Sequence, residues 1–144
     1  MLKKPKKNEP LPVVSIVMGS KTDEDVMGEC TKLLTQLKIP YEVVVTSCHR
    51  DFEKTREYAM NAKKRGIKVI VAGAGYAAAL PGFIASLTDL PVIGVPIPSS
   101  PLKGIDSILS IAELPKGIPV ATMGIGKGGA YNGALLAARI LKQK

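Results

Sequence analysis

Residues 13–23 of this chain read VVSIVMGSKTD, and this stretch indicates the fold. Its first six residues are almost continuously apolar, as in a strand that helices cover on both faces. Gly19 follows, and a segment with helical spacing then opens with Asp and Glu, whose negative charge suits the N-terminus of a helix. A buried strand that leads directly into a helix is the unit from which parallel α/β sheets are built.

The same alternation continues along the chain. Apolar segments that we interpret as strands occupy residues 13–18, 41–46, 68–72, 91–95 and 118–125. The first intervening helix is predicted from an apolar stripe formed by Val26, Met27, Cys30, Leu33, Leu34 and Leu37. The second is predicted over residues 52–65, and Gly66 ends it. Its apolar side consists of Phe52, Tyr58, Ala59 and Ala62.

Strands that alternate with helices predict a three-layer α/β domain with a five-stranded parallel sheet. We expect the flavodoxin-like (Rossmann-like) strand order 2-1-3-4-5. In that order, a ligand binds beyond the carboxyl ends of the strands, at the switch point between strands one and three. Loops with unusual composition follow the first three strands.

The length of 144 residues and the hydrophobic content of 46% fit one domain, which we place at residues 12–144 after a flexible basic leader, residues 1–11. The net charge of +8 lies largely in the terminal segments, since residues 10–141 hold 14 Lys and Arg against 11 Asp and Glu. With no Trp and no basic stripe, the sequence gives little support to nucleic-acid binding.

The chain contains two cysteines, Cys30 and Cys48, and one histidine. This inventory supplies neither a disulfide framework nor a structural zinc site within one chain. No apolar run approaches the 18 or so residues that span a membrane, and no secretory signal is recognisable. We expect a soluble cytoplasmic protein with reduced thiols and no membrane partner.

The last helical segment, residues 128–141, carries Ala, Leu, Ile and Gly on nearly every face. A helix that is apolar all round requires burial on all sides. In a chain of this size we expect a second subunit to provide that cover, which predicts a homo-oligomer.

The loop after the first strand, residues 19–23, combines a glycine, two hydroxyl groups and a helix start. These groups form a natural anion site, and Asp23 can accept hydrogen bonds from sugar hydroxyls. The alternative is that Thr22 or Asp23 only caps the helix.

The loop after the second strand contains the only histidine, His49, between Ser47 and Arg50. Imidazole is the side chain whose ordinary pKa suits proton transfer near neutral pH, and an arginine with a serine suits a phosphate. A nucleophilic pair of Cys48 and His49 is a rival interpretation, although adjacent side chains seldom point at one substrate atom.

The loop after the third strand, residues 73–82, reads GAGYAAALPG and formally matches a dinucleotide-binding fingerprint. That fingerprint normally follows the first strand and needs an acidic residue about 20 positions later, where only Asp89 is near. We expect instead that the small residues let the backbone approach a planar ligand and donate N–H bonds to it.

Six ordered motifs together resemble the 5-(carboxyamino)imidazole ribonucleotide mutases of purine biosynthesis. They are MGSKTD (18–23), SCHR (47–50), GAG with LPG (73–75 and 80–82), PVIGVP (91–96), GIDS (104–107) and GIPV (117–120). The resemblance covers residues 12–141. It implies a flavodoxin-like subunit of a homo-octamer, without metal or organic cofactor, that moves a carboxylate from the exocyclic nitrogen to C4 of the aminoimidazole ring.

The resemblance also implies the site residues. His49 corresponds to the acid/base that moves the proton, and Asp23 to a ribose ligand. The full implied substrate-binding set is Ser20, Asp23, Ser47, Cys48, Arg50, Ala74, Gly75 and Leu80. Within it, Ser20, Ser47 and Arg50 correspond to phosphate ligands, and Ala74 with Gly75 to the loop that wraps the ring and carboxylate.

Tyr76 stands where the family usually has glycine, Ala79 where it has histidine, and Cys48 where it has alanine. The sequence ends at Lys144, before a C-terminal extension that many members carry. Two alternatives to the mutase therefore remain open. One is a direct aminoimidazole ribonucleotide carboxylase that uses carbon dioxide, and the other is a homologue that binds a nucleotide or serves in assembly without turnover.

Overall fold

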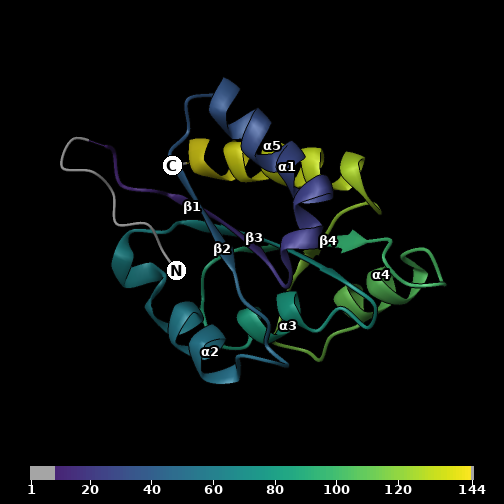
Figure 1. The fold of residues 1–144 in the computed structure, drawn as a ribbon. Helices are drawn as coiled ribbons and strands as arrows, with labels where there is room; N and C mark the ends of the chain where they lie inside the picture. Colours follow the sequence, from purple (N-terminus) through teal and green to yellow (C-terminus); the bar gives the residue numbers. More distant parts are fainter. Residues whose placement is uncertain (1–8, 144) are drawn as a thin grey trace.

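A parallel β-sheet runs through the centre of the computed structural model, which describes residues 9–143 (Figure 1). Within these residues its strands are β1 (Val14–Met18), β2 (Tyr41–Val45), β3 (Val69–Gly75), β4 (Val92–Ile97) and β5 (Ala121–Thr122). They lie in the order β2-β1-β3-β4-β5, and every neighbouring pair is parallel. This arrangement confirms the predicted flavodoxin-like α/β fold. Most of the predicted leader lies outside the described residues.

Helices cover both faces of the sheet, which gives the three predicted layers (Figure 1). The helices α1 (Glu24–Gln36) and α5 (Lys127–Lys142) pack together on one face. The other face is covered by α2 (Phe52–Asn61), α3 (Leu80–Ala85) and α4 (Ile105–Ala112). A hydrophobic core lies on each face of the sheet. Because side chains alternate along a strand, Ile16 packs into the core beneath α1 and α5, and Val17 packs into the core beneath α2, α3 and α4.

The predicted fifth strand, residues 118–125, was too long. β5 contains only Ala121–Thr122, which pair with Ile93 and Gly94 of β4. Pro119 has no N–H to donate to a ladder, and Gly117 before it adopts a left-handed φ of 98°. Because glycines at 124 and 126 follow closely, little regular strand can form at this edge.

The second predicted helix is divided in two. α2 ends at Asn61, and a 3-10 turn, η2 (Lys63–Arg65), continues to Gly66, which ends the segment with a φ of 97°. Phe52 was predicted on the apolar side but is 51% exposed. At the first turn of α2 its ring meets Phe83 of α3 edge-on, with ring centroids 5.4 Å apart, instead of packing under the sheet.

The last helix, α5, buries its small residues within the chain itself. Six of them are buried: Gly129, Ala130, Gly133, Ala134, Ala137 and Ala138. A Cβ at Gly133 would lie 3.3–3.5 Å from Val71, Val95 and Ile93, so the helix backbone lies close to the sheet. This stripe therefore does not require a second subunit, although the larger residues Leu135, Leu136 and Ile140 are only partly buried.

Two neighbouring glycines of α5 make a matched test of this packing. A Cβ on Gly129 would overlap the carbonyl oxygen of Gly124, whereas a Cβ on Gly128 meets nothing within 4 Å. We expect Gly129→Ala to lower the free energy of unfolding by about 1–3 kcal/mol, because the backbone has to shift. We expect Gly128→Ala to raise it by up to about 1 kcal/mol through helix propensity. Urea unfolding measures both, and equal effects would contradict the packing described.

Candidate active site at the carboxyl edge of the sheet

The register of the sheet brings the first three loops together. Met18, the last residue of β1, pairs with Val45 of β2 on one side and with Gly73 of β3 on the other. β1 and β2 therefore end level with each other, β3 continues two residues further to Gly75, and the loops after all three strands leave the same edge of the sheet. This is the predicted switch point, and it is where the structure places the loops of the predicted site.

The first loop is organised by Ser20 as a helix cap. The Ser20 hydroxyl oxygen accepts the Thr22 amide at 3.3 Å and the Thr22 hydroxyl at 3.0 Å. In return the Asp23 carboxylate accepts the Ser20 amide at 3.1 Å, which completes a capping box at η1 (Lys21–Asp23). The cap is thus Ser20, with Asp23 as its reciprocal partner, and not Thr22 or Asp23 acting alone. Because the Ser20 oxygen accepts both bonds, its proton remains available for a ligand.

The side chain of Asp23 is a buried carboxyl group at this edge of the sheet. Burial raises its pKa above the ordinary value, whereas the Ser20 amide and the nearby Arg50 guanidinium oppose that rise. A carboxylate that is withdrawn from water and lies close to a guanidinium is a strong acceptor for hydroxyl groups. The geometry therefore suits the sugar-binding role that the sequence indicates for Asp23.

The second loop is attached to the sheet, to α2 and to the first loop. The Thr46 amide donates to Met18 O at 2.9 Å, and the Thr46 and Thr55 hydroxyls lie 2.7 Å apart. The Arg50 guanidinium reaches across and donates from Nη2 to the Gly19 carbonyl at 3.3 Å. Arg50 thereby joins the two loops and places its positive charge close to Asp23.

Ser47 turns the chain within this loop. Its carbonyl accepts the Asp51 amide at 2.8 Å, and its hydroxyl accepts the Arg50 amide at 3.3 Å. The turn between them carries Cys48 and the exposed His49. No hydrogen bond to the imidazole of His49 is formed by the part of the chain that the structure describes, which leaves both ring nitrogens available to a substrate.

The Cys48 side chain packs against the apolar core below the loop, the one that contains Val44 and Tyr58. Burial raises the pKa of this thiol, which disfavours the nucleophilic thiolate. The rival interpretation of a Cys–His nucleophilic pair is therefore disfavoured.

The third loop begins later than predicted, because β3 continues to Gly75. Gly73, Ala74 and Gly75 pair with the last half of β4 and belong to the sheet. A Cβ on Gly75 would overlap the Ser99 hydroxyl and lie 3.2 Å from the Ile97 carbonyl, so the strands approach closely here. The predicted loop residue Leu80 is buried at the start of α3.

Between β3 and α3, the backbone carries unused donors. Within the described residues, none of the amide N–H groups of residues 76–79 donates to a backbone carbonyl. Tyr76 begins this segment with a φ of 55°, and its side chain is 61% exposed. The structure thus brings the first and second loops together at Asp23 and Arg50. His49 precedes Arg50 in the second loop, and the third loop lies at the same edge of the sheet.

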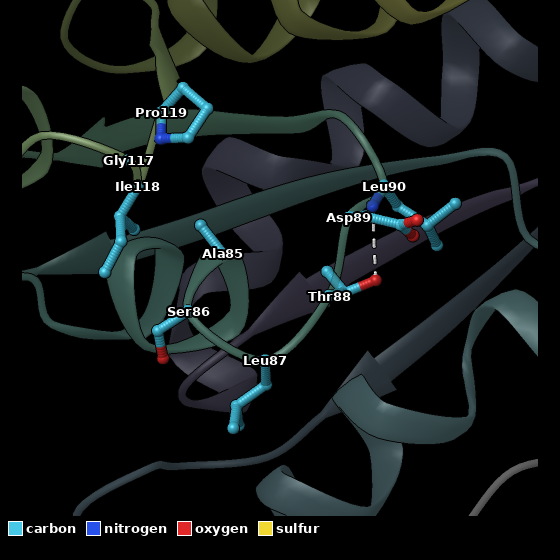
Figure 2. Close-up of a pocket in the computed structure, with 9 residues that line it drawn as sticks. All are labelled: Ala85, Ser86, Leu87, Thr88, Asp89, Leu90, Gly117, Ile118 and Pro119. Atoms are coloured by element: carbon cyan, nitrogen blue, oxygen red, sulfur yellow. Dashed lines mark hydrogen bonds between the residues drawn. The ribbon is translucent and has the colours of Figure 1, made fainter.

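A cavity of about 440 Å³ lies elsewhere in the molecule (Figure 2). Residues 85–90 and 117–119 line it, and these segments precede β4 and β5. It therefore opens at the amino edge of the sheet, opposite the three loops. Its only ionisable lining residue, Asp89, is exposed and forms an ion pair with Lys63 at 2.6 Å. None of the predicted site residues lines this cavity.

Within residues 9–143, no group of three or more His, Cys, Asp or Glu side chains is placed to hold a metal ion. Over the same range, no helix has the length and apolar character needed to cross a membrane.

Comparison with known proteins identifies the family. The AIR carboxylase family model matches residues 13–144. A protein of Saccharolobus solfataricus named N5-carboxyaminoimidazole ribonucleotide mutase is 58% identical over 131 residues, covering 91% of this chain and 82% of the relative. A protein of the same name from Haemophilus influenzae is 56% identical over 128 residues, covering 89% and 78%. The crystal structure of Treponema denticola PurE superposes with a TM-score of 0.80 at 30% identity, over 92% of this chain and 82% of that one. The chain belongs to the AIR carboxylase family.

Proposed function

We propose that this protein acts in de novo purine biosynthesis and interconverts 5-carboxyaminoimidazole ribonucleotide and 4-carboxy-5-aminoimidazole ribonucleotide. Relatives named as mutases of this substrate are 56–58% identical to the chain. The observation that carries the proposal is the Arg50 guanidinium, which spans loops one and two beside buried Asp23. It creates a site for a phosphate and a sugar next to the only imidazole of the chain.

Binding follows from the chemistry of each loop. Arg50 with the Ser20 and Ser47 hydroxyls holds the phosphate, and Asp23 accepts hydrogen bonds from the ribose. At the end of β3, Ala74 and Gly75 let the ring approach the backbone, and the free amides of residues 76–79 receive the carboxylate. Cys48 and Leu80 complete the wall below the substrate. The substrate is then fixed at both ends while its reacting carboxylate lies between His49 and the third loop.

The reaction is an isomerisation that needs one proton carrier. The bond between the exocyclic nitrogen and the carboxylate breaks, carbon dioxide leaves, and His49 donates a proton to the nitrogen. C4 of the aminoimidazole then attacks the enclosed carbon dioxide, and His49 removes the C4 proton, which restores the aromatic ring. Atoms and charge balance without a co-reactant. Catalysis comes mainly from holding carbon dioxide beside C4 and from excluding water.

The proposal also covers the assembly, cofactors and partners of the enzyme. It works as a single domain of residues 12–144 in a cytoplasmic homo-octamer, uses no metal or organic cofactor, and binds neither nucleic acid nor membrane. The exposed apolar residues Leu102, Ile105 and Leu109 at α4 support a subunit interface.

An ultraviolet assay of the purified protein tests this function. We expect 4-carboxy-5-aminoimidazole ribonucleotide to form from the carboxyamino substrate without added bicarbonate. If it forms only from aminoimidazole ribonucleotide with bicarbonate, the direct carboxylase replaces the mutase. If the nucleotide binds but neither substrate set is turned over, the non-catalytic alternative is correct.

A further inference from the structure

Ser107, in the first turn of α4, is a wholly buried hydroxyl that contacts the third loop. Its Oγ donates to the Tyr76 carbonyl at 2.8 Å and lies 3.3 Å from the Ile97 carbonyl. The Ile97 carbonyl also accepts the Ser99 amide at 2.9 Å. No backbone amide of the described residues donates to the Tyr76 carbonyl. Since a hydroxyl has one proton, the shorter bond to Tyr76 is the one that Ser107 has to supply.

Tyr76 needs such support because of its backbone conformation. Its φ of 55° lies in the left-handed region, which is costly for a residue with a Cβ. A strained residue keeps its conformation only where the surroundings impose it. Before Tyr76, Gly75 packs tightly against Ser99, and after it only the three residues 77–79 precede α3 at Leu80. Ser107 thus acts on the residue where the chain turns away from β3.

The hydrogen bond from Ser107 to the Tyr76 carbonyl also determines where the Ala77 N–H points. The Tyr76 carbonyl and the Ala77 N–H belong to one planar trans peptide group, in which they point in opposite directions. With the carbonyl directed at Ser107, the Ala77 N–H is directed away from α4. This amide is one of the free donors of the third loop.

We propose that Ser107 is a positioning residue for the reaction, which acts by fixing the Tyr76–Ala77 peptide so that its N–H faces the substrate carboxylate. The inference rests on the proposed function, because it assigns that peptide to the reacting end of the substrate. The phosphate and ribose are held by loops one and two, which Ser107 does not touch. Its removal should therefore lower kcat much more than it changes KM.

The test compares two serines of the same helix. Ser107→Ala should lower kcat about ten-fold, with KM nearly unchanged, because a misplaced donor affects the reacting group. Ser110 donates to the Asp106 carbonyl within α4 at 2.8 Å, so Ser110→Ala removes a hydroxyl without touching the loop. We expect it to keep the parent kcat. Ser107→Thr, which retains the hydroxyl, should recover most of the loss.

A second readout does not depend on turnover. In a crystal structure of Ser107→Ala, the Tyr76–Ala77 peptide should rotate, which changes ψ of Tyr76 and φ of Ala77. If Ser107→Ala does not fold, Ser107→Cys keeps the shape of the side chain with a slightly larger atom and a weaker donor, and it carries the same expectations.

Equal kcat values for Ser107→Ala and Ser110→Ala in an active parent enzyme would overturn the role of Ser107 and leave the proposed function standing. If the parent itself has no turnover, the proposed function fails, and the peptide geometry of the variant still decides whether Ser107 positions the loop. An unchanged peptide in that structure would reject the inference.

Discussion

His49→Asn is expected to lower turnover of the carboxyamino substrate by about 10²- to 10⁴-fold, the usual contribution of a general acid/base. His49 is the only histidine of the chain, so no second imidazole can take its place. The side chain is exposed and packs into neither core cluster, and we therefore expect the fold to be retained. Initial rates by ultraviolet absorbance measure the loss.

Nucleotide affinity and circular dichroism are the controls for this variant. Asparagine keeps the size and polarity of the side chain but cannot carry a proton. The affinity should stay close to that of the parent, because the proposed phosphate and ribose ligands are Ser20, Asp23, Ser47 and Arg50 and do not include His49. A variant that retains more than half of the parent rate would remove His49 from the mechanism.

Arg50→Ala is expected to weaken binding of the ribonucleotide by about 1.5–3 kcal/mol, the scale of a hydrogen bond to a charged group. The guanidinium donates to the Gly19 carbonyl of the first loop, and in the proposed function it is the charged ligand of the phosphate. The corresponding nucleoside has no phosphate and should lose much less affinity. Calorimetry with both ligands measures the difference.

Arg56→Ala is the matched control, because Arg56 is exposed on α2. Within the described residues, its only ion pair is with Glu53, at 3.8 Å. It should leave both affinities unchanged. Equal losses for nucleotide and nucleoside in Arg50→Ala would contradict the phosphate role.

The Arg50 guanidinium also opposes the raised pKa of Asp23, so its removal should raise that pKa further. The carboxylate is then protonated at higher pH. The pH below which affinity for the ribose falls should therefore be higher in Arg50→Ala than in the parent.

The sheet could be predicted from the sequence because strands buried on both faces are nearly continuous apolar runs. Residues 13–18 and 91–95 show this directly, and their order along the chain restricts the topology. β5 could not be delimited in this way, because its apolar run contains Pro119 and directly follows the left-handed Gly117, and both disfavour a regular ladder. α3 has six residues and includes Pro81 and Gly82, which is too short for a helical period to emerge.

The meeting of the first three loops at one edge could also be predicted, because loops after neighbouring parallel strands leave the sheet at the same edge. The capping box of Ser20 and Asp23 left a signal in the sequence, a serine followed three residues later by an acid. Ser107 left none. Its partner lies 31 residues away and is a backbone carbonyl, so only the packing of α4 under the third loop reveals the contact.

The most direct test of carboxylate transfer within one enclosed site is an isotope measurement. The carboxyamino substrate is prepared with ¹³C in its carboxylate and converted in buffer that contains unlabelled bicarbonate. We expect the 4-carboxy product to keep the label, because the carbon dioxide released from the nitrogen is captured by C4 before it escapes. A product that carries the unlabelled carbon of the buffer would contradict it.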